Sequence, residues 1–257
     1  NKRLSGVISL LVIGGLTLGF GCGDRATPLA QTGQHANTLG ERKPPLNYLL
    51  FLPQEYQEES QDQWPLILFL HGLGKRGSDL DNLEILKEVG PPMLVEQQPD
   101  FPFILLSPQC PEDHFWEKHL EDLETLLEKV VDVYNVNADR IYLTGISNGG
   151  FGAWHLALRN PNWFAAVIPI AGGYKFKSDE IPINICDLKS VPIWVFHGAK
   201  DTVVLPYQSE ILVDALKACD GQVQYTLYPD ADHDSWTRTY DNPELNKWLL
   251  QHTRVGG

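Results

Sequence analysis

The chain has 257 residues, of which 43% are hydrophobic, and its formal net charge is −13 at pH 7. Such an acidic balance disfavours nucleic acids and anionic membrane surfaces as electrostatic partners, so neither is expected. About 210 residues remain once the front end is set aside, which is enough for one large α/β domain with a well-buried core.

The beginning of the chain, residues 1–22, has the pattern of an export signal. Lys2 and Arg3 precede an apolar run over residues 7–20, and a glycine stands directly before Cys22. A basic start, a short apolar core and a small residue before the cut are typical of such signals, and the run is short for a membrane-spanning helix. Cys22 resembles the lipidated cysteine of a bacterial lipobox, so we expect a lipid-anchored protein of the cell envelope. A cleaved signal with a periplasmic or secreted product, and an uncleaved anchor, are the alternatives.

Residues 23–45 are rich in Gly, Thr, Gln, Asn and Pro and show little apolar periodicity. Such a composition predicts a flexible linker, with residues 46–257 forming the folded domain. Besides Cys22, cysteines occur at positions 110, 186 and 219. If Cys22 is lipidated, at most one disulfide can form among the other three, and the sequence does not choose the pair.

Apolar runs of strand length alternate with helical patterns from residue 47 onward. Strands are predicted over residues 47–52, 66–70, 103–106, 141–144, 165–170, 191–196 and 222–228, and helices over residues 120–134, 151–158, 207–219 and 243–252. Continuous apolar runs suit central parallel strands that are covered on both faces. The alternation therefore predicts an α/β fold with a mostly parallel sheet and helices on both faces. In such sheets, ligands bind at the carboxyl ends of the strands.

The most informative motif is Gly-x-Ser-x-Gly at residues 145–149, which is centred on Ser147. A strand precedes it and a helix follows, which is the layout of a nucleophile elbow, where a tight turn holds the serine hydroxyl at the edge of the sheet. The five-residue pattern alone is not specific, because an ordinary strand-to-helix turn could look the same. The flanking elements favour a catalytic serine.

A serine nucleophile needs a base within hydrogen-bond reach, and the base needs a carboxylate that orients it. On this architecture the chain order is serine, acid, histidine, which leaves His197, His233 and His252 as candidate bases. His233 lies in a polar loop between a strand and the last helices, and we favour it. His197 directly follows a strand and would be held beneath the site, whereas His252 would lie at the surface.

The expected acid is Asp201, which follows the strand at 191–196 through a loop that contains a glycine. Asp232 and Asp234 are close neighbours of His233 in the chain and could not easily reach round it. Loop capping or a solvated charge explains these two aspartates better.

Backbone donors and aromatic side chains complete the predicted site. The oxyanion of the reaction needs N–H donors, and we expect them from Asn148, after the nucleophile, and from Leu73, in the loop after residues 66–70. Trp236 is the first candidate for an aromatic acyl pocket, and Trp116 with its neighbour Phe115, after a strand-end loop, is the second, although such residues more often belong to a core. Neither a zinc-binding nor a phosphate-binding motif occurs in the sequence, so no metal or organic cofactor is expected.

Four segments together resemble the ordered signatures of the α/β-hydrolase superfamily, within it the phospholipase/carboxylesterase and dienelactone-hydrolase-like branch. They are residues 70–74, 145–150, 197–204 and 232–236. Residues 107–111 and 233–248 are also similar to bacterial esterases described as predicted peptidases or feruloyl-esterase-like. One departure is Asn148, where the family often carries Met or Gln.

This resemblance implies a serine hydrolase that cleaves a small-molecule carboxylic ester through an acyl-serine intermediate. It implies Ser147 as nucleophile, His233 as base and Asp201 as the group that orients the base, with Leu73 and Asn148 as oxyanion donors. The alternatives are a serine peptidase of prolyl-oligopeptidase type that acts on small peptides, and a non-catalytic surface binding protein on the same scaffold. The ester itself and the oligomeric state are not indicated by the sequence.

Overall fold

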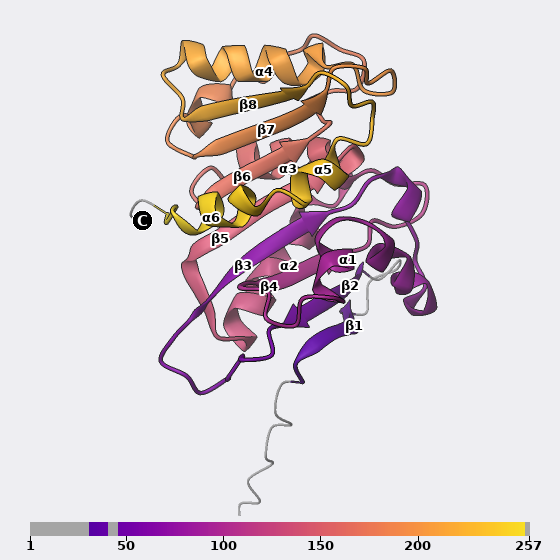
Figure 1. Cartoon of the computed structure of the whole chain (residues 1–257), viewed down its shortest axis with the longest axis vertical. Helices are drawn as coiled ribbons and strands as arrows, with labels where there is room; N and C mark the ends of the chain where they lie inside the picture. The colour runs from indigo at the N-terminus through magenta and orange to yellow at the C-terminus, as the bar shows by residue number, and fades with distance from the viewer. Residues whose placement is uncertain (1–30, 41–45, 255–257) are drawn as a thin grey trace, which may run out of the picture.

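A computed structural model describes residues 31–40 and 46–254 of the chain. In this part, eight strands form one sheet in the order β1-β2-β4-β3-β5-β6-β7-β8 (Figure 1). The strands are β1 (Gly33–Leu39), β2 (Leu46–Leu52), β3 (Trp64–Leu70), β4 (Ile104–Pro108), β5 (Val136–Ile146), β6 (Ala166–Ile170), β7 (Ile193–Gly198) and β8 (Val223–Tyr228). The helices are α1 (Gly90–Val95), α2 (Leu120–Val133), α3 (Asn148–Arg159), α4 (Tyr207–Ala218), α5 (Trp236–Tyr240) and α6 (Pro243–Leu250). Short 3-10 helices are η1 (Leu73–Lys75), η2 (Leu80–Glu88), η3 (Trp116–Lys118) and η4 (Ile185–Leu188).

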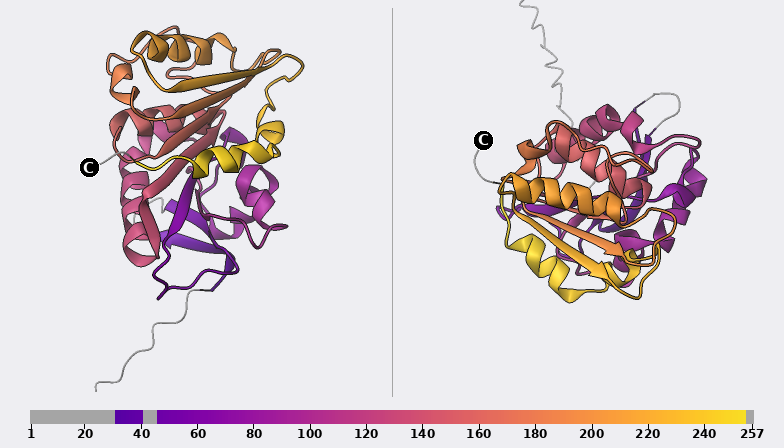
Figure 2. Two further views of the ribbon diagram at one scale, coloured as in Figure 1. Left: turned by 60° about the vertical axis from the view of Figure 1, so that its left-hand side comes forward. Right: turned by 90° about the horizontal axis from the view of Figure 1, so that it is seen from above.

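The sheet is parallel from β4 through β3 and β5 to β8, whereas β1 and β2 pair antiparallel with each other and β2 with β4. Successive residues of a strand face opposite sides of the sheet. On β3, Leu66 and Leu68 accordingly enter one hydrophobic core and Ile67 and Phe69 the other. Helices α2, α3 and α4 contribute to the first core and α1, α5 and α6 to the second, so both faces are covered (Figures 1 and 2). The predicted fold class is confirmed.

The first strand, β1, lies where the sequence predicts a flexible linker. Residues 33–39 form β1, which pairs with β2 along its whole length, from Gly33 opposite Leu52 to Leu39 opposite Leu46. The flexible linker expected over residues 23–45 is therefore wrong for this stretch. An edge strand satisfies its backbone on one side only and tolerates polar, half-exposed side chains, so composition alone does not reveal it. The export signal and Cys22 lie outside the described residues.

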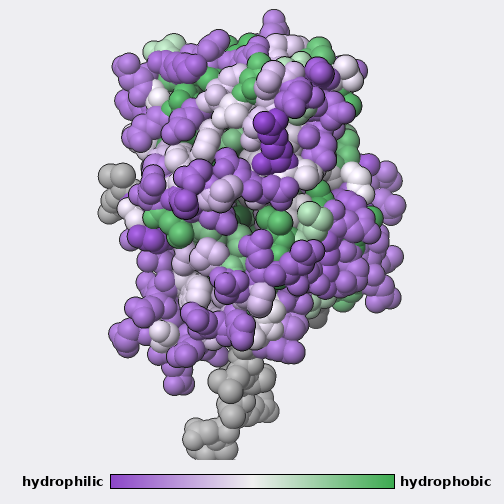
Figure 3. Space-filling view, viewed as in Figure 1, coloured by the Kyte–Doolittle hydropathy of each residue, from purple (hydrophilic) through white to green (hydrophobic). Residues whose placement is uncertain are grey.

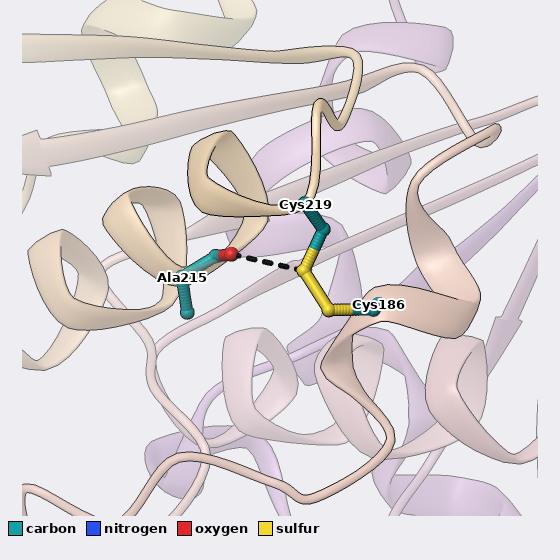
Figure 4. The surroundings of a disulfide bond; sticks show 3 residues. All are labelled: Cys186, Ala215 and Cys219. Carbon is teal, nitrogen blue, oxygen red and sulfur yellow. Dashed lines mark hydrogen bonds between the residues drawn. A yellow bond between two sulfur atoms is a disulfide. The ribbon is translucent and has the colours of Figure 1, made fainter.

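Cys186 in η4 and Cys219 after α4 form a disulfide, with their Cα atoms 5.7 Å apart (Figure 4). The sequence alone did not choose this pair. Cys110, two residues after β4, is a free and buried thiol. The disulfide therefore fastens the segment after β6 to the end of α4.

Hydrophilic side chains cover most of the face shown in Figure 3, with apolar side chains in small patches between them. Within residues 31–40 and 46–254, no helix is both long enough and apolar enough to cross a membrane.

Candidate active site

The elbow after β5 places Ser147 in a backbone conformation that side chains rarely adopt, with φ 52° and ψ −117°. Its N–H donates to the carbonyl of Ile170 at the end of β6, with N and O 2.9 Å apart. A Cβ at Gly149 would run into the carbonyl of Leu70, so α3 can approach β3 only where this glycine stands. Backbone strain of this kind persists where the surrounding structure fixes the conformation. This conformation of Ser147 holds its hydroxyl clear of the sheet.

Three side chains from three loops form one hydrogen-bonded chain. His233 Nε2 lies 2.9 Å from Ser147 Oγ, and His233 Nδ1 lies 2.7 Å from Asp201 Oδ2. The loops follow β5, β7 and β8, so all three meet at the carboxyl edge of the parallel strands. With Asp201 ionised, Nδ1–H donates to the carboxylate, which leaves Nε2 as the acceptor for the serine hydroxyl. The structure thus brings together Ser147, His233 and Asp201, which the sequence predicts to act together.

The carboxylate of Asp201 is 2% exposed and fully engaged. Its Oδ1 accepts the N–H groups of Val203 and Val204 at 2.9 and 3.0 Å. Burial alone would raise the pKa of Asp201, but the hydrogen bonds from His197, His233 and the two amides outweigh it and hold the pKa well below its usual range. Asp201 is therefore a carboxylate at neutral pH, suited to orient a histidine and to balance its positive charge.

The loops that carry Asp201 and His233 lie directly against each other. A Cβ at Gly198 would collide with the carbonyl of Asp232, and the N–H of Lys200 donates to Ala231 O at 2.9 Å. The distance between the acid and the base is therefore set by backbone contacts rather than by the two side chains alone.

The loop after β3 is held by a buried histidine. His71 Nδ1 lies 2.6 Å from Gly72 O, and His71 Nε2 accepts the N–H of Cys110 at 2.9 Å. Burial lowers the pKa of His71 to about 4, so the ring is neutral, with one nitrogen donating and the other accepting. Leu73, which follows Gly72, is the first residue of η1 and lines the same pocket as Ser147 and Asn148. Both predicted oxyanion donors thus lie beside the serine, and their role stays a prediction.

That pocket has a volume of about 390 Å³. Its apolar walls are Leu73, Phe115, Phe151, Phe176, Val203 and Val204, and Glu117 and Lys175 are its charged members. Of these walls, Leu73 and Phe115 are predicted from the sequence, Phe115 because it follows a strand-end loop. Phe151 and Phe176 carry no local signal.

The prediction that Trp116 contacts substrate is wrong. Its side chain is fully buried, packs where Gly152 leaves room, and donates its Nε1–H to His71 O at 2.9 Å. Trp116 therefore supports the loop after β3 from below, and its neighbour Phe115 lines the pocket.

Trp236 lies against His233 rather than in the pocket of Ser147. The two rings meet edge to face with centroids 5.2 Å apart. Trp236 lines a different hollow, of about 280 Å³, together with Gly90 and Tyr240. Trp236 therefore does not line the pocket of Ser147, and a contact of its indole with substrate stays a prediction.

The model of the dienelactone hydrolase family matches residues 109–247, a stretch that contains Ser147, Asp201 and His233. A Salmonella typhimurium protein assigned as a carboxymethylenebutenolidase is 30% identical over 100 residues, which cover 38% of this chain and 37% of that protein. A poly(3-hydroxyoctanoate) depolymerase of Pseudomonas fluorescens is 28% identical over 140 residues, or 48% of this chain and 50% of the relative. The chain thus matches at most half the length of these relatives.

Among solved structures, the crystal structure of a thermostable esterase is similar with a TM-score of 0.70 and 32% identity, covering 86% of this chain and 63% of that chain. A feruloyl esterase module of Clostridium thermocellum has a TM-score of 0.61 at 14% identity, covering 82% of this chain and 86% of that chain. Likeness at the latter identity shows a shared fold.

Proposed function

This chain belongs to the dienelactone hydrolase family, whose model spans more than half of it, and on that premise we propose that it is a serine hydrolase that cleaves carboxylic esters of small molecules. The observation that carries the proposal is the continuous hydrogen-bonded chain from Ser147 through His233 to Asp201, set beside an apolar pocket. Similarity to a thermostable esterase at 32% identity supports the same reaction class.

In the proposed reaction, Ser147 Oγ attacks the ester carbonyl carbon while His233 Nε2 takes the hydroxyl proton. The negative oxygen of the tetrahedral intermediate accepts hydrogen bonds from the N–H groups of Leu73 and Asn148, each of which contributes about 2.7–4 kcal/mol to lowering the barrier. His233 then gives its proton to the leaving alcohol. A water molecule, deprotonated by His233, attacks the acyl-serine and releases the acid, after which the proton returns to Ser147.

Hydrolysis of nitrophenyl esters tests this proposal. We expect the Ser147→Ala variant to lose activity by about 10⁴–10⁶-fold without loss of folding, since the nucleophile and its base act as a unit. Ser60→Ala, in the loop between β2 and β3, is the matched control and should keep wild-type rates. Faster turnover of peptide anilides than of esters would favour the peptidase alternative, and a folded wild type that turns over neither would favour the binding protein.

We also propose that the protein is exported and lipidated at Cys22. The basic and apolar pattern of residues 1–22 supports this, and so does the Cys186–Cys219 disulfide, because such bonds persist in oxidising compartments outside the cytoplasm. After expression of the full-length protein in bacteria, the wild type should sediment with membranes and the Cys22→Ala variant should not, whereas Cys110→Ala should behave as wild type. An unprocessed, cytoplasmic protein would contradict the proposal.

A further inference from the structure

The pocket beside Ser147, here termed the acyl pocket, carries information about the substrate. We propose that it binds the acyl part of the ester, and that this acyl group is apolar, carries no carboxylate and is longer than acetyl. The inference rests on the proposed function and deepens it, because it names the chemical class of the group that is transferred to the serine.

The position of the base assigns the acyl side. His233 must protonate the leaving alcohol, so the alcohol departs next to the imidazole. The acyl pocket is lined by Ser147, Asn148 and Leu73, whereas the ring of His233 is not part of its lining. The alcohol and the acyl group lie on opposite sides of the scissile bond, so this pocket receives the acyl group.

The walls favour an apolar group. Leu73, Phe115, Phe176 and Val203 are 42%, 43%, 54% and 51% exposed, although all are large and apolar. Apolar side chains that stay exposed together around a nucleophile mark a binding groove rather than a core. A chain that covers them gains about 25 cal/mol for each Å² of apolar surface removed from water.

The charges disfavour an anionic acyl group. Lys175 is the one cation in the lining, and its Nζ already pairs with Glu180 Oε2 at 2.8 Å. Glu117 adds a carboxylate to the same lining and lies 3.4 Å from His155 Nε2. A carboxylate at the end of the acyl chain would face Glu117 and would have to compete with Glu180 for the lysine.

The test compares nitrophenyl esters of acetate, hexanoate and octanoate with the monoester of adipate, which has the six carbons of hexanoate and a terminal carboxylate. We expect kcat/KM to rise at least tenfold from acetate to octanoate, and to be at least tenfold lower for adipate than for hexanoate. Phe176→Ala should reduce the octanoate-to-acetate ratio several-fold. Ile183→Ala is the matched control, because Ile183 is exposed but lies outside the lining.

Equal rates from acetate to octanoate, or faster hydrolysis of the adipate ester, would overturn the inference while leaving the proposed function standing. If no ester is hydrolysed, the proposed function fails, and binding still decides the nature of the pocket. Calorimetry with the Ser147→Ala variant should then show tighter binding of hexanamide than of the monoamide of adipic acid. The reverse order would overturn the inference.

A second inference concerns the buried side of the Asp201 carboxylate. Oδ2 of Asp201 contacts two imidazoles, His233 Nδ1 at 2.7 Å and His197 Nε2 at 3.2 Å. We infer that His197 is a positioning residue that holds the Asp201 carboxylate from the buried side. This inference also assumes the proposed roles of Asp201 and His233.

Contacts on both sides of the His197 ring fix its position. Nδ1 lies 2.8 Å from Ser209 Oγ, which in turn lies 2.8 Å from Gly172 O. On the other side, His197 Nε2 faces Val204 O at 2.9 Å and the Asp201 carboxylate at 3.2 Å, and both are acceptors. A proton on Nε2 can therefore be donated toward Asp201, which holds the carboxylate from below.

The groups in contact with the rings of His197 and His233 are few. Asp201 is the titratable side chain that contacts His197, whose other partners, Ser209 and Val204, are neutral at this contact. His233 contacts Asp201 and Ser147, and the indole of Trp236 packs on its ring. The other carboxylates of its loop, at positions 230, 232 and 234, are exposed to solvent.

Two substitutions of His197 test this inference, because glutamine can donate to Asp201 and leucine cannot. We expect His197→Gln to keep kcat/KM for ester hydrolysis within about threefold of wild type, and His197→Leu to lower kcat by at least about tenfold with little change in KM. Rescue by the donating side chain, with both variants folded, separates this role from a merely structural one. Equal losses of kcat in the two folded variants would overturn the inference.

Discussion

At the scale of single residues, His71 shows how a buried imidazole can fix a loop next to a nucleophile. The ring bridges the Gly72 carbonyl and the Cys110 amide, and burial lowers its pKa to about 4. Its carbonyl also accepts the indole N–H of Trp116. Because one nitrogen donates and the other accepts, only the neutral ring fits, and the chain reaches Leu73 in a fixed direction.

This neutral histidine makes folding stability depend on pH. In the unfolded chain a histidine titrates near pH 6.5, whereas the pKa of folded His71 is lowered to about 4. Its neutral form therefore stabilises the fold fully above about pH 6.5, and up to about 3 kcal/mol is lost as the pH falls toward 4. We expect urea unfolding of His71→Gln to show lower stability at pH 7.5 but a smaller further loss by pH 4.5.

His35→Gln, in the edge strand β1, is the control and should keep the wild-type slope of stability against pH. Equal slopes for wild type and His71→Gln would show that His71 is not the group responsible.

At the scale of elements, the strand–turn–helix unit formed by β5, Ser147 and α3 depends on close backbone contact. Gly149 lies against the Leu70 carbonyl of β3, and a Cβ at Gly145 would run into Gly149 itself. The glycines therefore let α3 begin directly over the sheet, which is why the motif places its serine at the edge where ligands bind.

We expect Gly149→Ala to be destabilised by more than about 3 kcal/mol, or not to fold, since the added carbon meets backbone atoms that cannot turn aside. Gly74→Ala is the matched control, because nothing lies within 4 Å of its added carbon. Thermal unfolding followed by circular dichroism measures both. A Gly149→Ala protein as stable as wild type would contradict the close contact.

The central elements and the hydrogen-bonded trio are predictable from the sequence because their signals are local. Strand β3 is a continuous apolar run, and β5 is buried over residues 141–146, although its first half is polar. Ser147, Asp201 and His233 each follow a strand in the expected order. The sequence does not predict β1, whose polar side chains hide an edge strand, and it misplaces Trp116. Whether an aromatic residue after a strand turns inward depends on the elements above it, here the space over Gly152, which no single segment of sequence contains.

At the scale of the whole molecule, the described residues form one sheet with a large hydrophobic core on each face, and the two edges of the sheet differ. The antiparallel strands β1 and β2 extend one edge, while β7 and β8 carry Asp201 and His233 toward the other. The Cys186–Cys219 disulfide lies on the side of α4, where η4 packs. The family match over residues 109–247 agrees with the resemblance seen in the ordered motifs.

Removing this disulfide should lower stability and spare the site. The two cysteines are 33 residues apart in sequence, so loop closure contributes about 3–4 kcal/mol, or roughly 10 °C in Tm for a domain of this size. We expect a Cys186→Ser/Cys219→Ser double variant to melt earlier by this amount and to keep ester hydrolysis within about twofold at 25 °C. Reduction of the wild type should reproduce the shift, and an unchanged Tm would contradict the structural role of the bond.

The central claim is that Ser147, activated by His233, forms a covalent acyl-enzyme. Reaction with a fluorophosphonate probe, followed by peptide mass spectrometry, tests it most directly. We predict a single adduct on Ser147 in the wild type, much slower labelling in His233→Ala, and none in Ser147→Ala. Labelling that persists in Ser147→Ala, or a folded wild type that takes up no probe, would contradict it.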